Sequence, residues 1–285
     1  MAGAFAPAKI NLCLHVGPLD AGGYHPLGSL VVFADVGDRV TLRAAGRLSL
    51  EITGPFAAGL DADDNLVVRA LRALGKTCGI EPALAVTLDK QLPIASGLGG
   101  GSSDAGATLR AGREALGLDI SDAALEAIAA TLGADGPMCF RARTAIATGR
   151  GEVLAPAPVL PPLHMVLANP GAPSPTGAVY RAYDQGRVAS ADLPPAPEGF
   201  ADLDALLAWL EGTRNDLQAP AMTLTPAIGE AMETLAALDG VRFARMSGSG
   251  ATCFALFDSA DAASEAARGL SAARPGWWVR AALAS

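Results

Sequence analysis

The segment from Pro93 to Ser103 constrains the fold most, because it places several glycines directly before a helix. Its sequence is PIASGLGGGSS, and residues 104 to 116 contain good helix formers with an apolar stripe. Backbone N–H groups of such a loop can approach an anion unobstructed by Cβ atoms, and a helix N-terminus adds about half a positive charge. The hydroxyls of Ser102 and Ser103 can bind phosphate or a metal ion. A phosphate-binding loop is therefore predicted, with a flexible loop or a glycine helix cap as the alternative.

Other nucleotide and nucleophile motifs do not fit this chain. Gly75, Lys76 and Thr77 resemble the end of a Walker A loop, but Ala70 stands where that motif needs its first glycine. The glycine loop does not satisfy G-x-G-x-x-G in either register, which opposes a Rossmann dinucleotide site. No G-x-S-x-G nucleophile elbow is present. A second glycine cluster, MSGSGAT at residues 246 to 252, indicates a turn that could bring further backbone donors toward a phosphate.

Composition limits the class of protein. Of the 285 residues, 51% are hydrophobic and 18% charged, which is typical of a globular protein with one large or two packed domains. The formal net charge of −8 opposes a broad nucleic-acid or anionic-membrane surface. No apolar stretch approaches the ~20 residues that cross a bilayer, and no basic region precedes an apolar signal core, so a cytoplasmic location is expected. The four cysteines form no C-x-x-C, which opposes a zinc site or a disulfide framework.

Hydrophobic periodicity predicts an α+β chain of two domains. Residues 9 to 16 alternate between apolar and polar side chains, which indicates a strand whose polar face carries Lys9 and Asn11. The sequence APAPVLPP at residues 155 to 162 cannot continue a helix or a central strand. We therefore predict an N-terminal domain at residues 1–155 and a C-terminal domain at residues 156–285.

Three segments together resemble the motifs of the GHMP kinases, in the usual order of that family. They are APAKINLCLHV at residues 6 to 16, PIASGLGGGSSDA at 93 to 105 and MSGSGATCFALF at 246 to 257. The resemblance implies an N-terminal domain like the second domain of ribosomal protein S5, a C-terminal ferredoxin-like domain and an active site in the cleft between them. It also implies ATP as cosubstrate and Mg²⁺ bridging the β- and γ-phosphates. The sequence identifies no protein ligands for the metal ion.

Four further segments are similar to the family members that phosphorylate the 2-hydroxyl of 4-diphosphocytidyl-2-C-methyl-D-erythritol in the non-mevalonate pathway of isoprene biosynthesis. These segments are Gly23 to His25, Asp64 to Leu66, Leu132 to Pro137 and Asn215 to Leu217. The alternatives are another GHMP kinase, acting on homoserine or mevalonate, and a nonenzymatic nucleotide-binding member of the fold. The resemblance implies a small-molecule substrate, no nucleic-acid or membrane partner, and a monomer or weak homodimer.

Carried over by position, the resemblance makes Lys9 and Asp135 the catalytic pair. A carboxylate can accept the proton of an attacking alcohol, and a cation can stabilise the developing oxyanion. From local sequence alone, Lys9 could be a solvated strand residue and Asp135 a turn residue. Gly136 replaces a more typical Val after the aspartate, and Val31 stands where relatives can offer an aromatic ring, so both positions could affect the geometry of the site.

The remaining site residues are implied by the same resemblance. Tyr24 and His25 are expected to recognise cytidine, Tyr180 to supply a second aromatic wall, and Asn11 to hold the substrate. For Tyr24 and His25, an ordered loop with a partly buried ring is the alternative. The residues expected at ATP are Pro93, Ile94, Ala95, Ser96, Gly97, Leu98, Gly99, Gly100, Gly101, Ser102, Ser103, Asn65 and Lys90.

Overall fold

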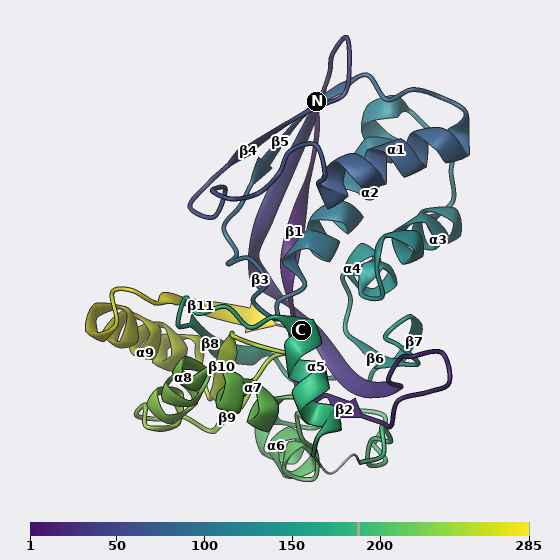
Figure 1. Cartoon of the computed structure of the whole chain (residues 1–285). Coiled ribbons are helices and arrows are strands. Elements are labelled where there is room, and N and C mark those ends of the chain that lie inside the picture. Colours follow the sequence, from purple (N-terminus) through teal and green to yellow (C-terminus); the bar gives the residue numbers. More distant parts are fainter. Residues whose placement is uncertain (187–188, 285) are drawn as a thin grey trace. The chain divides into compact units, whose positions relative to one another are not determined.

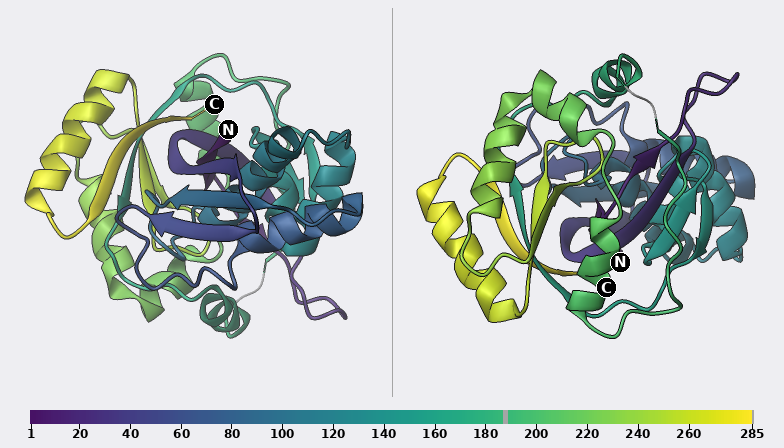
Figure 2. Two further views of the ribbon diagram at one scale, coloured as in Figure 1. Left: turned by 90° about the horizontal axis from the view of Figure 1, so that it is seen from above. Right: turned by 90° about the horizontal axis from the view of Figure 1, so that it is seen from below.

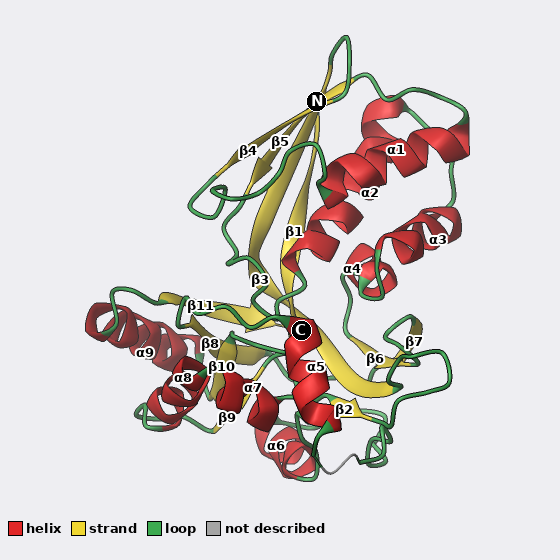
Figure 3. Ribbon diagram, in the orientation of Figure 1, coloured by secondary structure: helices red, strands yellow, loops and turns green. Residues whose placement is uncertain are grey.

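The structure is a computed structural model that describes residues 1–186 and 189–284 (Figure 1). Its described residues divide into two compact units. Unit 1 comprises Met1–Lys9, Gly37–Ile94 and Gly99–Arg143, and unit 2 comprises Ile10–Val36, Ala95–Leu98 and the chain from Thr144 onward. Both units combine helices with strands, as predicted for the α+β class (Figure 3).

The two units are interleaved along the chain. Strand β1 (Ala2–Asn11) begins in unit 1 and ends in unit 2, whereas β3 (Leu27–Ala44) begins in unit 2 and ends in unit 1. The predicted division between residues 155 and 156, which rests on the proline-rich residues 155 to 162, stays a prediction.

Unit 1 is a sheet with its helices gathered on one side, as Figure 1 shows from the front and Figure 2 from above. In β5 (Leu84–Asp89), buried and half-buried residues alternate, which is the period of two that the sequence predicts. It lies between β4 (Ser49–Thr53), to which it is parallel, and the second half of β3, to which it is antiparallel. The helices are α1 (Leu66–Cys78), α2 (Gly100–Leu116), α3 (Asp122–Leu132) and α4 (Gly136–Arg141).

The core of unit 1 forms where these helices meet the sheet. Leu71 of α1, Leu109 of α2 and Leu125 of α3 are fully buried in one cluster with Val86 of β5. Because α2 also begins at the glycine loop, this packing fixes the place at which the loop ends.

Unit 2 is built on an antiparallel sheet. Strand β8 (Leu163–Asn169) lies between β10 (Cys253–Phe257) and β11 (Trp278–Ala284), and β9 (Phe243–Met246) pairs with β10. Helices α8 (Pro226–Ala236) and α9 (Ala260–Ala273) pack on this sheet. The other elements are β2 (His15–Val16), β6 (Ala145–Thr148), β7 (Val153–Pro156), α5 (Thr176–Asp184), α6 (Leu203–Glu211) and α7 (Gln218–Leu224).

Candidate active site

Lys9 and Asp135 form an ion pair in unit 1, although they are 126 residues apart in the sequence. Lys9 lies near the end of β1, and its Nζ donates to Asp135 Oδ2 at 3.2 Å. The ammonium is buried, whereas 38% of the Asp135 side chain is exposed. A reacting hydroxyl can therefore reach the carboxylate, and the adjacent cation can stabilise negative charge that develops there.

Gly136 allows the helix that follows Asp135 to pack closely on α3. A Cβ atom at Gly136 would lie only 2.0 Å from the carbonyl oxygen of Ala129. The glycine that departs from the family pattern thus has a packing reason in this chain. It lets α4 begin against the backbone of α3, and the start of α4 sets the position of Asp135.

Replacing Gly136 by Ala should therefore destabilise the protein by about 1–3 kcal/mol, the usual cost of an overpacked core site. The matched control is Gly133→Ala, because Gly133 has an extended backbone with φ of 163° and no atom within 4 Å of an added Cβ. That variant should stay within about 0.5 kcal/mol of the parent. Urea unfolding of both variants measures the difference, and equal stability would contradict the packing argument.

The predicted phosphate loop leads directly into α2. Gly97 and Gly99 have positive φ values of 78° and 63°, and Gly99 is the residue that precedes the helix. Gly101 is exposed, while Gly100 and Ser102 are half-buried at the start of the helix. The first N–H groups of a helix have no partner within it, so they are available to an anion. The geometry therefore permits the phosphate binding that the sequence predicts, and that role stays a prediction.

Residues 246 to 252, the second glycine cluster, form hydrogen bonds with the middle of the predicted phosphate loop, and both segments belong to unit 2. Ser247 Oγ donates to the Gly97 carbonyl at 3.0 Å and accepts from Asn11 N at 3.1 Å. Thr252 N donates to the Ser96 carbonyl at 3.0 Å. The cluster thus connects the loop with the strand that carries Asn11. Ser247 was not among the predicted site residues; its place in the repeated Gly-Ser pattern was the only signal.

Asn11 is buried, and one of its two side-chain polar atoms is available to a ligand. Its Nδ2 donates to Ser29 Oγ at 2.7 Å, whereas its Oδ1 has no hydrogen-bond partner within the described residues. A buried acceptor without a partner is costly unless a ligand or water satisfies it. This arrangement is compatible with the predicted substrate contact. Nothing in the local sequence around Ser29 indicated its part in orienting Asn11.

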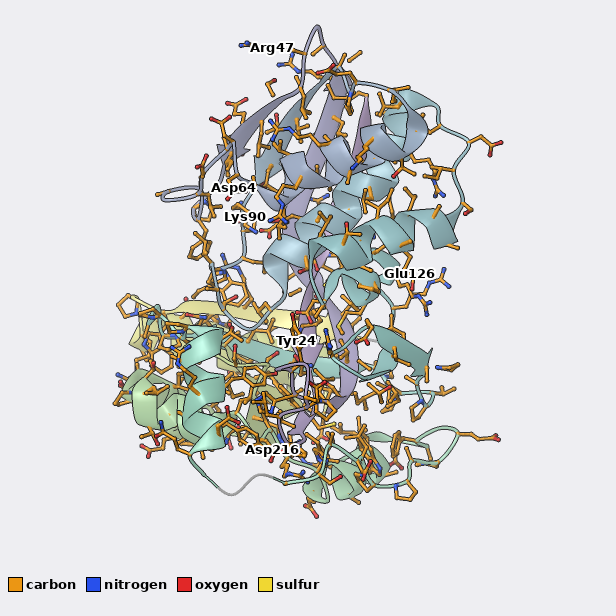
Figure 4. All side chains as sticks on the ribbon, turned by 45° about the vertical axis from the view of Figure 1, so that its right-hand side comes forward. Tyr24, Arg47, Asp64, Lys90, Glu126 and Asp216 are labelled. Carbon is orange, nitrogen blue, oxygen red and sulfur yellow. The ribbon has the colours of Figure 1, made fainter. Side chains whose placement is uncertain are left out.

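Lys90 lies in unit 1 (Figure 4). Its side chain is buried between two carboxylates. Its Nζ donates to Asp104 Oδ2 at 2.7 Å and to Asp38 Oδ2. Asp38 Oδ1 accepts from the backbone N–H groups of Gln91 and Leu92 at 2.6 and 2.8 Å. Lys90 therefore ties β3 to the first turns of α2, and its predicted contact with ATP stays a prediction. Asp38 and Asp104 were missed from sequence, because a single acidic residue gives no sign of burial.

Burial raises the pKa of the Asp104 carboxyl to about 7, and the attraction of Lys90 only partly opposes this shift. The unfolded chain should titrate this group near 3.9. Between these values the folded state holds more protons than the unfolded state, so the free energy of unfolding falls as the pH rises from about 4 to 7.

Replacing Asp104 by Asn should remove this contribution, since the amide does not titrate. We expect the parent to lose more unfolding free energy than Asp104→Asn between pH 5 and pH 8. Urea unfolding at both pH values tests this, and the same change in both proteins would contradict it.

Asn65 caps α1. Its Oδ1 accepts from Val67 N at 3.0 Å, and its Nδ2 donates to the Asp61 carbonyl at 3.3 Å. These bonds explain why the helix begins at Leu66. Asn65 therefore has a structural role in capping α1, and its contact with ATP remains a prediction.

The predicted cytidine-recognising residues lie in unit 2. The His25 ring centroid lies 5.3 Å from that of Tyr180. Tyr24 is 52% exposed, and the Arg150 guanidinium lies 3.6 Å from the centroid of its ring (Figure 4). The structure thus brings His25 and Tyr180 together, whereas Tyr24 stacks with an arginine. Val31 is fully buried in β3, so its side chain offers no surface for stacking.

Comparison with known proteins decides the family. Residues 65–142 match the family described as GHMP kinases N terminal domain, and residues 197–275 match the GHMP kinases C terminal family. This chain belongs to the GHMP kinases. The predicted activity class, an ATP-dependent small-molecule kinase, is thereby confirmed, and so is the two-domain α+β GHMP fold.

Relatives resemble this GHMP kinase over nearly its full length. The 4-diphosphocytidyl-2-C-methyl-D-erythritol kinase of Caulobacter sp. (strain K31) is 56% identical over 281 residues, covering 97% of this chain and 96% of the relative. The protein of the same name from Parvibaculum lavamentivorans is 49% identical over 280 residues, covering 98% and 97%.

Solved structures agree with this assignment. A crystal structure of 4-(cytidine 5'-diphospho)-2C-methyl-D-erythritol kinase has a TM-score of 0.81 and 34% identity, and the match covers 99% of both chains. Homoserine kinase from Cytophaga hutchinsonii has a TM-score of 0.66 at 18% identity, covering 100% of this chain and 94% of that one, so it shows the fold alone.

Within residues 1–186 and 189–284, no helix has the length and apolar character of a membrane span. No group of three or more His, Cys, Asp or Glu side chains there could hold a metal ion.

Proposed function

We propose that this chain transfers the γ-phosphoryl group of ATP to the 2-hydroxyl of 4-diphosphocytidyl-2-C-methyl-D-erythritol, in the non-mevalonate pathway to isoprenoid precursors. The observation that carries the chemistry is the ion pair between Lys9 and Asp135, with its buried cation and accessible carboxylate. The similarity to kinases named for this substrate, over 97% of the chain, supports the choice of acceptor.

In the proposed reaction, Asp135 accepts the hydroxyl proton as the oxygen attacks the γ-phosphorus. Lys9 keeps the carboxylate oriented and stabilises the charge that develops on the attacking oxygen. The loop of residues 93–103 positions the phosphates through the N–H groups at the start of α2. Phosphoryl transfer requires little covalent chemistry from the protein, so positioning and electrostatics supply most of the acceleration.

Mg²⁺ fits this site as an ion that arrives with ATP. Magnesium in kinases is commonly held by one or two protein oxygens together with substrate phosphates and water, so a dedicated cluster of carboxylates is not required. In unit 1, Ser103 is the oxygen donor that would hold it, because its buried Oγ has no hydrogen-bond partner among the described residues. When bound, the ion neutralises phosphate charge.

We propose that Tyr24, His25 and Tyr180 bind the cytosine ring and Asn11 a polar group of the substrate. We also propose that the N-terminal domain is like the second domain of ribosomal protein S5 and the C-terminal domain ferredoxin-like. A cytoplasmic location, the lack of nucleic-acid partners and a monomeric or weakly dimeric state stay predictions.

Separate Tyr24→Ala and His25→Ala variants should raise the KM for the cytidine substrate much more than the KM for ATP. Loss of a base stack costs ~1–3 kcal/mol, or roughly 5- to 150-fold in affinity. His164→Ala is a suitable control, because His164 lies in β8 and no role is assigned to it. Selective loss of ATP affinity in the Tyr24 and His25 variants would show that these residues bind ATP instead of the cytidine substrate.

The proposed function is tested by ADP release from the purified protein with three acceptors. The cytidine diphosphate methylerythritol substrate should give a far higher kcat/KM than homoserine or mevalonate. A preference for either of the other two would replace the proposed substrate while keeping the kinase activity.

A further inference from the structure

Arg110 connects two elements of unit 1 through hydrogen bonds to their main chains. Its Nη1 donates to the Phe140 carbonyl and, at 3.5 Å, to the Cys139 carbonyl, both near the end of α4. Its Nη2 donates to the Phe5 carbonyl of β1 at 3.2 Å. A guanidinium presents its N–H donors in a rigid plane, so it can keep acceptors from two elements in a fixed relation. Arg110 itself belongs to α2, the helix that follows the predicted phosphate loop.

The two connected elements carry the proposed catalytic pair. Asp135 directly precedes α4, and its carbonyl accepts from Cys139 N at 3.0 Å in the first turn of that helix. Lys9 lies on β1, further along the strand than Phe5. Because a helical turn and a few residues of strand move as rigid pieces, a shift of α4 against β1 would change the distance between the Lys9 ammonium and the Asp135 carboxylate.

The backbones of α2 and α4 also approach each other closely beside Arg110. A Cβ atom added to Gly106 would lie 2.8 Å from the Cys139 carbonyl oxygen and 2.8 Å from Cα of Phe140. Gly106 precedes Arg110 by about one helical turn, so both lie on the same face of α2. The last carbonyls of a helix have no partner within it, and a cation is favourable there. Arg110 thus fixes the end of α4 where the two helices already touch.

We propose that Arg110 is a positioning residue for phosphoryl transfer, because it sets α4 against β1 and thereby sets the Asp135 carboxylate against the Lys9 ammonium. This inference rests on the proposed function of that pair. Among the described residues, the Asp135 side chain makes no capping bond to α4, so its ion pair at 3.2 Å depends on where the helix lies. A misplacement of ~1 Å at a reacting group can slow a reaction about 10²-fold.

Single-turnover transfer from ATP to the cytidine diphosphate methylerythritol substrate tests this role in a double-mutant cycle. Arg110→Met removes the charge and every donor, whereas Arg110→Lys keeps the charge but loses the planar pair of nitrogens. Each is measured alone and together with Asp135→Asn. Arg113→Met is the matched control, because Arg113 also lies in α2 but donates to the Ile120 carbonyl instead of α4 or β1.

Leu74→Ala controls for a general loss of stability. Leu74 is a fully buried residue of α1 in the core of unit 1. Its truncation leaves a cavity and destabilises the same unit, but it removes no hydrogen bond to α4 or β1. All variants are compared at a temperature at which thermal melting shows them folded. Arg113→Met and Leu74→Ala should then transfer the phosphoryl group at the rate of the parent.

Arg110→Met should slow the transfer by about 10- to 100-fold, the effect of a displaced reacting group, and Arg110→Lys by a smaller factor. The dissociation constants for ATP and acceptor should change by less than about threefold, since only the chemical step is affected. In the Asp135→Asn background, either replacement should slow the reaction by no more than about threefold, because changes that act through one group are not additive.

Three results would overturn the positioning role and leave the proposed function intact. They are the rate of the parent in both folded Arg110 variants, equal fold losses with and without Asp135→Asn, and a loss in Leu74→Ala as large as that in Arg110→Met. The rate of the parent in Asp135→Asn alone would overturn the role of the pair and this inference with it. A parent that transfers nothing to the cytidine substrate would overturn the proposed function as well.

Discussion

Replacing Asp135 by Asn should lower the single-turnover rate of phosphoryl transfer by about 10²–10⁴-fold, the usual contribution of a general base. The amide keeps the size of the side chain and can still accept from Lys9, but it cannot take the hydroxyl proton. The dissociation constants for ATP and acceptor should change far less. Rapid-quench measurement is needed, because slow product release can hide the chemical step in a steady-state rate.

Asp258→Asn is the control for this experiment. Asp258 is an exposed carboxylate paired with Arg242, so its replacement removes the same charge from a pair that does not include Lys9. Its single-turnover rate should match that of the parent. If a folded Asp135→Asn protein also kept a near-normal rate, Asp135 would be at most a positioning residue.

Gly97→Ala should be strongly destabilising. Gly97 has a φ of 78°, and a Cβ atom there would lie 2.3 Å from the Ser247 carbonyl oxygen. Left-handed backbone costs roughly 1–2 kcal/mol for an L-residue and overpacking about 1–3 kcal/mol, so we expect a loss of about 2–5 kcal/mol. ATP affinity should fall as well, because the loop would have to move away from residues 246–252.

Gly240→Ala separates the cost of left-handed backbone from the cost of overpacking. Gly240 has a similar φ of 73°, but no atom lies within 4 Å of an added Cβ. This control should lose only the backbone term of about 1–2 kcal/mol and keep its ATP affinity. Urea unfolding and ATP titration of both variants provide the comparison. Equal losses in the two variants would show that close packing at Gly97 contributes nothing.

The sequence was sufficient to predict that Lys9 and Asp135 lie together and that a helix follows the glycine loop. Lys9 and Asp135 lie in separate motifs, and the structure brings them within 3.2 Å. A glycine run before a helix-forming segment has few other physical explanations, so a helix after the loop was expected, but α2 begins at Gly100, four residues before the predicted helix-forming segment. Local patterns of this kind can be interpreted from the chemical properties of their own residues.

The supporting polar groups could not be predicted in the same way. Asp38 and Ser247 have roles that depend on which distant residues surround them after folding. Burial of a carboxylate or hydroxyl is decided by tertiary packing, and single polar residues in a sequence are more often exposed. Their partners Lys90 and Gly97 lie 52 and 150 residues away along the chain, which no local period can reveal.

Element boundaries were predicted less well than element types. The alternation over residues 9 to 16 indicated one strand, but β1 ends at Asn11 and β2 covers only His15 and Val16. The chain leaves β1 to make other contacts: Leu14 N donates to the Arg214 carbonyl, and Leu14 forms a bridge with Asn215. Side-chain alternation persists through such a change of partner, so the pattern could not locate it.

The proposed function requires this kinase to phosphorylate one hydroxyl of a cytidine diphosphate sugar alcohol. Phosphorus NMR of the reaction of purified protein with ATP and 4-diphosphocytidyl-2-C-methyl-D-erythritol tests this. We expect ADP together with a new phosphate monoester attached at the 2-position, while the diphosphate bridge of the acceptor stays intact. Formation of ADP and inorganic phosphate alone, or of a monoester on another hydroxyl, would contradict it.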